Sequence, residues 1–155
     1  MSSAFLGAYW QSREENRDAC AARISSFLER AASVNSELST WVLKGRVRKS
    51  SLAPIELSPA AISSILKSNN RDTTGEPMRE LGFSFGVWNG STTGFSGTVG
   101  AFARGLKNHV VLETDLALNE DSWHRIAGLV AEAFDPDSMI VSSKEAGEWL
   151  KYSRP

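Results

Sequence analysis

Apolar and polar residues alternate most regularly in the middle of the chain, between Glu80 and Gly90. Four apolar residues occupy every second position, and small residues and one tryptophan lie between them: Leu81, Phe83, Phe85 and Val87, then Gly82, Ser84, Gly86 and Trp88. A period of two is typical of a β-strand with one buried face. Asn89-Gly90 follows, a dipeptide that suits a turn with positive φ. The pattern predicts a strand and hairpin turn with the character of scaffold rather than of an active site.

Five further apolar segments predict strands, at residues 4–10, 40–43, 94–102, 109–114 and 139–141. Short connections join the strand at 80–90 to the two that follow it. These three should therefore form an antiparallel meander.

Two helices are predicted in the first half of the chain from apolar residues at spacings of three and four. The first should follow a capping box formed by Ser12 and Glu15 and continue to about Val34. The second should begin at Ser58-Pro59, because serine is a good N-cap and proline suits the first helical position.

Two more helices are predicted in the second half. Asn119 or Glu120 should begin the third, with a buried stripe of Trp123, Ile126, Ala127, Val130 and Phe134, and Asp135-Pro136 should end it. Ser142 and Glu145 form a second capping-box pattern, which predicts a final helix presenting Ala146, Trp149 and Leu150. The order indicates the α+β class: a mainly antiparallel sheet of about five to six strands packed with about four helices, in a single domain of residues 1–155.

Composition indicates the cellular compartment in which the protein acts. Cys20 is the only cysteine, so the chain can form neither an intrachain disulfide nor a multi-cysteine zinc site, which fits a reducing cytoplasm. The N-terminus lacks the basic region and apolar run of a secretory signal. No segment approaches the roughly 18 apolar residues of a membrane span. We expect a soluble, cytoplasmic protein.

The distribution of charge is more informative than the net charge of −1. Residues 1–112 contain 13 basic and 9 acidic residues, whereas residues 113–155 contain 4 basic and 9 acidic residues. An acidic face on the C-terminal part would steer a basic partner. Such a partner could itself be a protein that binds nucleic acid.

Candidate catalytic groups are few. His109 and His124 are the only imidazoles, and their positions are more typical of surface or capping residues, while Cys20 falls on the apolar stripe of the first helix and belongs to the core. The carboxylate pairs Glu113/Asp115 and Asp135/Asp137 could serve a hydrolase or hold a divalent metal ion. A solvated acidic rim is the interpretation we favour for both pairs.

Two other motifs have ordinary explanations. Glycines 94, 97 and 100 match neither a dinucleotide fingerprint nor a phosphate loop, and in strands such glycines usually mark bulges or close backbone approach. The basic run at residues 44–49 is more typical of a solvated loop than of a phosphate site.

The five tryptophans divide by context. Trp41, Trp123 and Trp149 lie in or beside apolar stripes, which favours the core. Trp10 and Trp88 lie at strand ends, and Trp88 is out of phase with the apolar positions of its strand. Its side chain should therefore lie on the opposite sheet face, covered by a helix or exposed to a partner.

Several short motifs occur together in a characteristic order: Tyr9-Trp10, then Leu81-Gly82-Phe83 with Trp88-Asn89-Gly90, then Phe134-Asp135-Pro136-Asp137. This arrangement resembles the immunity protein 52 family of bacterial polymorphic-toxin systems over most of the chain. The resemblance implies a non-catalytic protein without cofactors that neutralises a cognate nuclease toxin of restriction-endonuclease type. Such toxins are delivered between competing bacteria, for example by type VI secretion. The partner would be encoded by a neighbouring gene, and no nucleic acid, membrane or small-molecule substrate is expected.

The expected contacts with the toxin are an aromatic and polar pair in the central motif and six carboxylates that would mimic phosphates toward a basic groove: Trp88, Asn89, Glu113, Asp115, Glu120, Asp121, Asp135 and Asp137. The toxin could be inhibited by blocking its active site or by preventing its assembly. Two alternatives stay open: a small hydrolase that uses a carboxylate site near Asp135 and Asp137, and an adaptor module unrelated to toxins.

Overall fold

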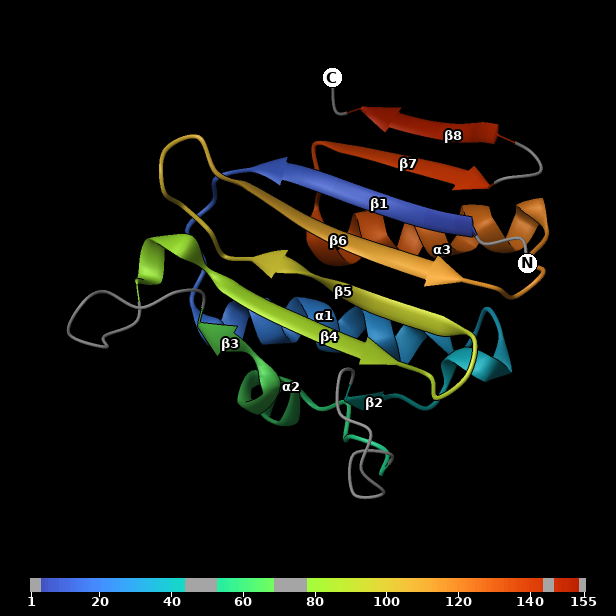
Figure 1. The fold of residues 1–155 in the computed structure, drawn as a ribbon, viewed down its shortest axis with the longest axis horizontal. Helices are drawn as coiled ribbons and strands as arrows, with labels where there is room; N and C mark the ends of the chain where they lie inside the picture. The colour runs from blue at the N-terminus through green and yellow to red at the C-terminus, as the bar shows by residue number, and fades with distance from the viewer. Residues whose placement is uncertain (1–3, 44–52, 69–77, 144–146, 154–155) are drawn as a thin grey trace.

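The computed structural model describes residues 4–43, 53–68, 78–143 and 147–153, the last of these by its backbone alone. They form one eight-stranded sheet with helices against one face (Figure 1). The strands are β1 (Ala4–Gln11), β2 (Val42–Leu43), β3 (Lys67–Ser68), β4 (Phe83–Trp88), β5 (Thr93–Val99), β6 (Lys107–Thr114), β7 (Ser138–Ser143) and β8 (Gly147–Ser153). The helices are α1 (Arg17–Ala31), α2 (Pro59–Ile65) and α3 (Glu120–Phe134).

The strand order is β2-β4-β5-β6-β1-β7-β8, with β3 paired to β4 beside β2. Every pairing is antiparallel, and β4, β5 and β6 form the meander that the sequence predicted. The first strand of the chain, β1, lies between β6 and β7. It therefore joins the central meander to the C-terminal strands.

The predicted start of the first helix is wrong. The N-cap of α1 is Asn16, whose Oδ1 accepts a hydrogen bond from the backbone N–H of Ala19 at 2.7 Å, so Ser12 and Glu15 lie before the helix. Glu15 instead accepts hydrogen bonds from Arg13 at 3.2 Å and from Arg23 at 2.6 Å. Two guanidinium partners outcompete a single backbone amide for this carboxylate, because charge-assisted bonds are the stronger ones.

The other two helices agree with their predicted caps. Ser58 accepts a hydrogen bond from the Ala61 N–H and precedes Pro59 at the start of α2. Asn119 caps α3, whose predicted stripe is buried throughout. Asp135 ends α3 in the left-handed conformation, with φ of 48°.

The predicted final helix is also wrong, because residues 147–153 form β8 and pair with β7. Seven residues are too few for a stable isolated helix, whereas β7 offers an unpaired edge, and tryptophan and tyrosine suit strands. Glu145 and Ala146, part of the predicted cap and helix, lie outside the described residues. The described chain thus has three α-helices and eight strands, against the expected four helices and five to six strands.

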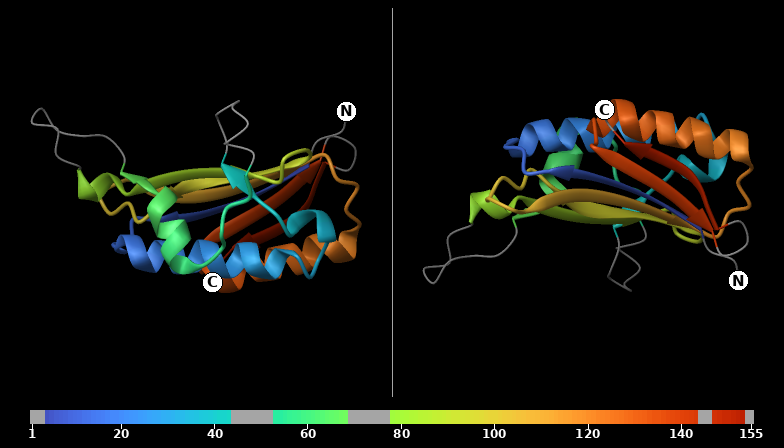
Figure 2. Two further views of the ribbon diagram at one scale, coloured as in Figure 1. Left: turned by 90° about the horizontal axis from the view of Figure 1, so that it is seen from below. Right: turned by 90° about the horizontal axis from the view of Figure 1, so that it is seen from above.

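The core fills the space between the sheet and the helices α1 and α3 (Figure 2). Aromatic rings from the sheet and both helices meet there: Phe27 and Phe95 have ring centroids 4.7 Å apart, and Trp10 stacks on Phe134 at 5.8 Å. Cys20, Trp41 and Trp123 are buried, which confirms their predicted place in the core. Within the described residues, no helix is long and apolar enough to cross a membrane.

Candidate functional site

The candidate site lies on the sheet face that the described helices leave uncovered, the face toward the viewer in Figure 1. Residues in register across β4, β5, β6, β1 and β7 form three rows on this open face. The rows are Trp88-Gly94-Glu113-Phe5-Ser142, Gly86-Ser96-Val111-Gly7-Ile140 and Ser84-Thr98-His109-Tyr9-Ser138. The open face is therefore mainly a mixture of small, hydroxyl, aliphatic and aromatic residues, with one carboxylate and one imidazole.

A hollow of about 290 Å³ occupies one end of this face. It lies over the first row, where Gly94 has no side chain between its register partners Trp88 and Glu113. The sequence placed Trp88 on the face opposite the apolar residues of its strand, and the structure confirms this orientation, with the residue only partly buried. Asp115, which follows β6, adds a second carboxylate to the lining.

Polar contacts hold the wall of the hollow. The Oδ1 atom of Asn89 accepts hydrogen bonds from the backbone N–H groups of Ser91, Thr92 and Thr93, at 2.8 to 3.1 Å. The hydroxyls of Thr93 and Thr114 are 2.7 Å apart and buried. Asn89 therefore shapes the β4–β5 turn, which is a structural role beside the contact role predicted for it.

The six carboxylates predicted to form one acidic face lie at two opposite ends of the molecule. Thr114, at the end of β6, pairs with Ala4 at the start of β1, whereas the backbone N–H of Asp137 donates to Tyr9 near the other end of β1. The helix α3 runs between the two ends, and its 15 residues span about 22 Å. Glu113, Asp115, Glu120 and Asp121 thus share the end with the hollow, and Asp135 and Asp137 lie at the other (Figure 1).

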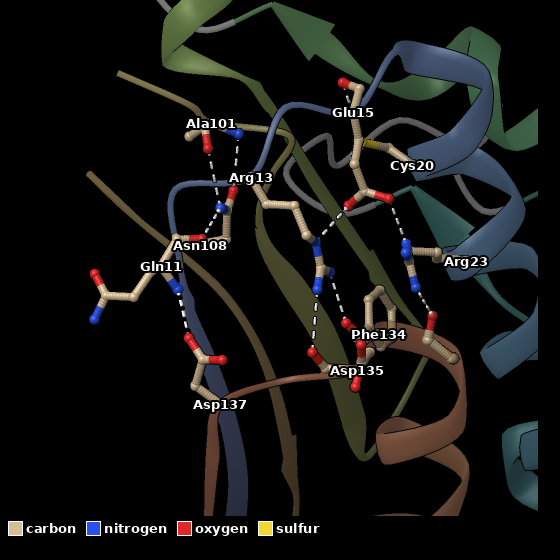
Figure 3. A network of polar contacts seen from close by, with 11 residues as sticks. Gln11, Arg13, Glu15, Cys20, Arg23, Ala101, Asn108, Phe134, Asp135 and Asp137 are labelled. Carbon is tan, nitrogen blue, oxygen red and sulfur yellow. Dashed lines mark hydrogen bonds and ion pairs between the residues drawn. The ribbon is translucent and has the colours of Figure 1, made fainter. Parts of the chain in front are cut away.

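Asp135 and Asp137 belong to a structural network at the C-terminal end of α3 (Figure 3). Arg13 donates to the carbonyls of Phe134 and Asp135, and Arg23 donates to the carbonyl of Ala133. Guanidinium groups at this end satisfy the carbonyls that no helical N–H reaches. Asp137 accepts a hydrogen bond from the Gln11 N–H at 2.9 Å. The two aspartates therefore join β1 to α3 and β7.

Little in the described residues favours catalysis. They contain no group of three or more His, Cys, Asp or Glu side chains placed to hold a metal ion. Burial, reinforced by the nearby Glu15 carboxylate, raises the pKa of the Cys20 thiol to about 12, which leaves almost no reactive thiolate at neutral pH. His109 is half-buried in the third row, where burial lowers its pKa below the ordinary value of 6.5. His124 lies on the exposed side of α3, 3.5 Å from Glu120.

The prediction from sequence missed two features of the site. Gly94 lines the hollow. Because it precedes the buried Phe95 in a strand of alternating burial, the sequence could have placed it on the open face. The roles of Arg13 and Arg23 were not predicted, because sequence spacing cannot show which carbonyls a long side chain reaches.

Comparison with known proteins gives the family. A search of curated proteins finds no match to the chain. The family model described as immunity protein 52 matches residues 2–154, which is nearly the whole length. An open sheet face beside a fully packed core agrees with a binding protein, and the match shows that the chain belongs to the immunity protein 52 family.

Proposed function

We propose that this protein is an antitoxin that binds a cognate nuclease toxin one-to-one and neutralises it without catalysis. The toxin would be an effector encoded by a neighbouring gene and delivered between bacteria, for example by a type VI secretion system. The antitoxin would act in the cytoplasm, where an incoming nuclease meets DNA. Membership of the immunity protein 52 family carries the proposal.

The open face of the sheet supports a role in binding. A stable protein–protein complex buries about 800 Å² on each partner. Five adjacent strands, β4, β5, β6, β1 and β7, present alternate side chains on this face with no described helix over them. Aromatic residues favour interfaces, and Tyr9 and Trp88 are both on this face.

The carboxylates at the hollow end would assist the encounter. Glu113, Asp115 and Asp121 are exposed, and Glu120 is 76% exposed. A nuclease needs a basic surface to bind DNA, so acidic groups on its inhibitor would attract that surface from a distance. Asp135 and Asp137 would contribute less, because they lie at the other end of α3.

The proposal is tested by purifying the protein with the product of its neighbouring gene. Calorimetry should give a stoichiometry of one, and DNA cleavage by the gene product should fall in proportion to the added antitoxin. If the complex forms and a DNA substrate can no longer bind, the inhibitor blocks the active site. If DNA still binds but the toxin changes its oligomeric state, the inhibitor prevents assembly. Absence of a complex would overturn the proposal.

A further inference from the structure

We propose that the hollow over Gly94 receives the side chain of an arginine from the toxin, between the Trp88 indole and the carboxylates of Glu113 and Asp115. This inference rests on the proposed function for the identity of the partner. The chemistry of the hollow is argued from this chain alone.

The backbone register creates the hollow. Trp88, Gly94 and Glu113 are direct neighbours on three adjacent strands, so a missing side chain in the middle leaves space between an aromatic ring and a carboxylate. Ser96 and Val111 of the second row close one side. The space of about 290 Å³ is at the lower limit of small-molecule sites and suits one inserted side chain.

The charge of the lining selects a cation. Among the described residues that line the hollow, Glu113 and Asp115 are acidic and none is basic. Neither carboxylate takes part in an ion pair within the described part of the chain. Both carboxylates line the same hollow, so their two negative charges add rather than diverge. The described residues contain no group of three or more His, Cys, Asp or Glu side chains placed to hold a metal ion, here or elsewhere.

Arginine fits this lining better than lysine. A guanidinium is planar, stacks on an indole ring, and presents five N–H donors in one plane. The lining offers several acceptors for them, since the carboxylates are accompanied by the hydroxyl residues Ser91 and Ser96. A lysine ammonium would have the charge but neither the flat face nor the fork of donors.

The wall of the hollow is already ordered without a partner. Asn89 holds the turn through three backbone N–H groups, and its Nδ2 donates to the Thr92 hydroxyl at 2.9 Å. The backbone N–H of Asp115 donates to the Thr92 carbonyl at 3.0 Å, which ties the end of β6 to the same turn. A preformed site loses little conformational entropy when it binds.

The first experiment tests the hollow without the toxin. N-acetyl-L-arginine amide is titrated into ¹⁵N-labelled protein, with N-acetyl-L-citrulline amide as its uncharged isostere. The arginine compound should shift the Trp88 indole N–H and Gly94 amide signals, with a dissociation constant on the order of millimolar for a single side chain. The citrulline compound should not. The shifts should disappear in the Glu113→Gln/Asp115→Asn variant. Equal shifts with both compounds, or none at the hollow, would overturn the proposal.

The second experiment uses the toxin and two kinds of variant. Glu113→Gln/Asp115→Asn removes the charge, and Gly94→Val fills the hollow with a side chain that suits a strand. Each should weaken the complex about tenfold or more. The matched control is Glu14→Gln/Glu80→Gln, which neutralises two exposed carboxylates away from the hollow and should change affinity less than twofold. Thermal unfolding of each variant separates lost binding from lost folding.

The outcomes distinguish the two proposals. If the toxin binds wild type and both hollow variants equally well, the hollow is not the docking point, although the antitoxin function stands. If the arginine compound binds the hollow but no toxin complex forms, the hollow does bind a guanidinium group. The proposal that a toxin supplies this group would then be overturned.

Discussion

His109 occupies the centre of the third row on the open face, between its register partners Thr98 and Tyr9. Partial burial lowers its pKa below 6.5 because the charged imidazolium loses hydration. The unfolded chain, in which the imidazole has its ordinary pKa, therefore binds more protons near pH 6 than the folded protein does.

We expect the free energy of unfolding to decrease as pH falls below 6.5, by at most about 1.4 kcal/mol per pH unit from this one proton. The decrease should be shallower in His109→Gln, which cannot be protonated. Urea unfolding at several pH values between 5 and 8 measures both slopes. Parallel curves for the two proteins would show that His109 makes no difference to the pH dependence.

Glu15 has a different residue-scale role, since it lies between Arg13 and Arg23 while both arginines also hold the C-terminal carbonyls of α3. Its side chain is 10% exposed. Glu15→Gln would remove the charge that pairs both guanidinium groups, and we expect a loss of about 2 kcal/mol in the free energy of unfolding.

The control for this change is Glu14→Gln, at the exposed neighbouring position, which should alter stability by less than about 0.5 kcal/mol. Denaturant unfolding compares the two. Equal stability in both variants would mean that the arginines cap α3 without help from Glu15.

At the scale of elements, the close pairing of β5 with β6 depends on one glycine. A Cβ atom at Gly97 would lie 2.2 Å from the carbonyl oxygen of His109 and 2.9 Å from the Cα of Val110. Both are backbone atoms of β6 and cannot move without breaking the pairing. This agrees with the prediction that glycines in this strand mark close backbone approach.

Gly97→Ala should therefore destabilise the protein by about 2 kcal/mol, an overpacking cost. Gly128→Ala on the exposed side of α3 is the matched substitution, because nothing lies within 4 Å of a Cβ there. It should stabilise by about 0.5–1 kcal/mol through helix propensity. Thermal unfolding midpoints that move in the same direction for both variants would contradict this explanation.

Local patterns predicted most elements, and they failed where distant partners decided the outcome. The alternation in β4 from Phe83 onward and the stripe of α3 depend only on which face is buried, so these predictions were confirmed. Leu81, the first apolar position of the predicted strand, lies instead in a 3-10 helix before β4. Glu15 formed ion pairs instead of a capping box because Arg23 lies within reach after folding. Residues 147–153 became a strand because β7 offered an edge, which no local pattern reveals.

At the scale of the whole molecule, the fold determines where the carboxylates of the acidic C-terminal part lie. The excess of carboxylates can be counted in the sequence, but only the structure shows that α3 separates the six predicted contact residues into two groups at opposite ends. The same limit applies to the hollow, which exists only because three strands align a tryptophan, a glycine and a glutamate.

We expect Glu120→Gln/Asp121→Asn to slow toxin association about threefold to tenfold at low salt and to leave the dissociation rate nearly unchanged. These two carboxylates are exposed in the first turn of α3, at the hollow end, where they would steer without being enclosed. Stopped-flow mixing at two salt concentrations measures both rates. Glu14→Gln/Glu80→Gln is the control, and an equal slowing there would indicate that total charge matters rather than its location.

The one-sided sheet has an evolutionary consequence. Along each central strand, alternate residues pack under α1 and α3, and those between them lie on the open face without supporting the core. Single substitutions at Ser96, Thr98 or Glu113 could therefore accumulate during evolution and adapt the surface to a changed binding partner. The buried residues that maintain the fold would not have to change.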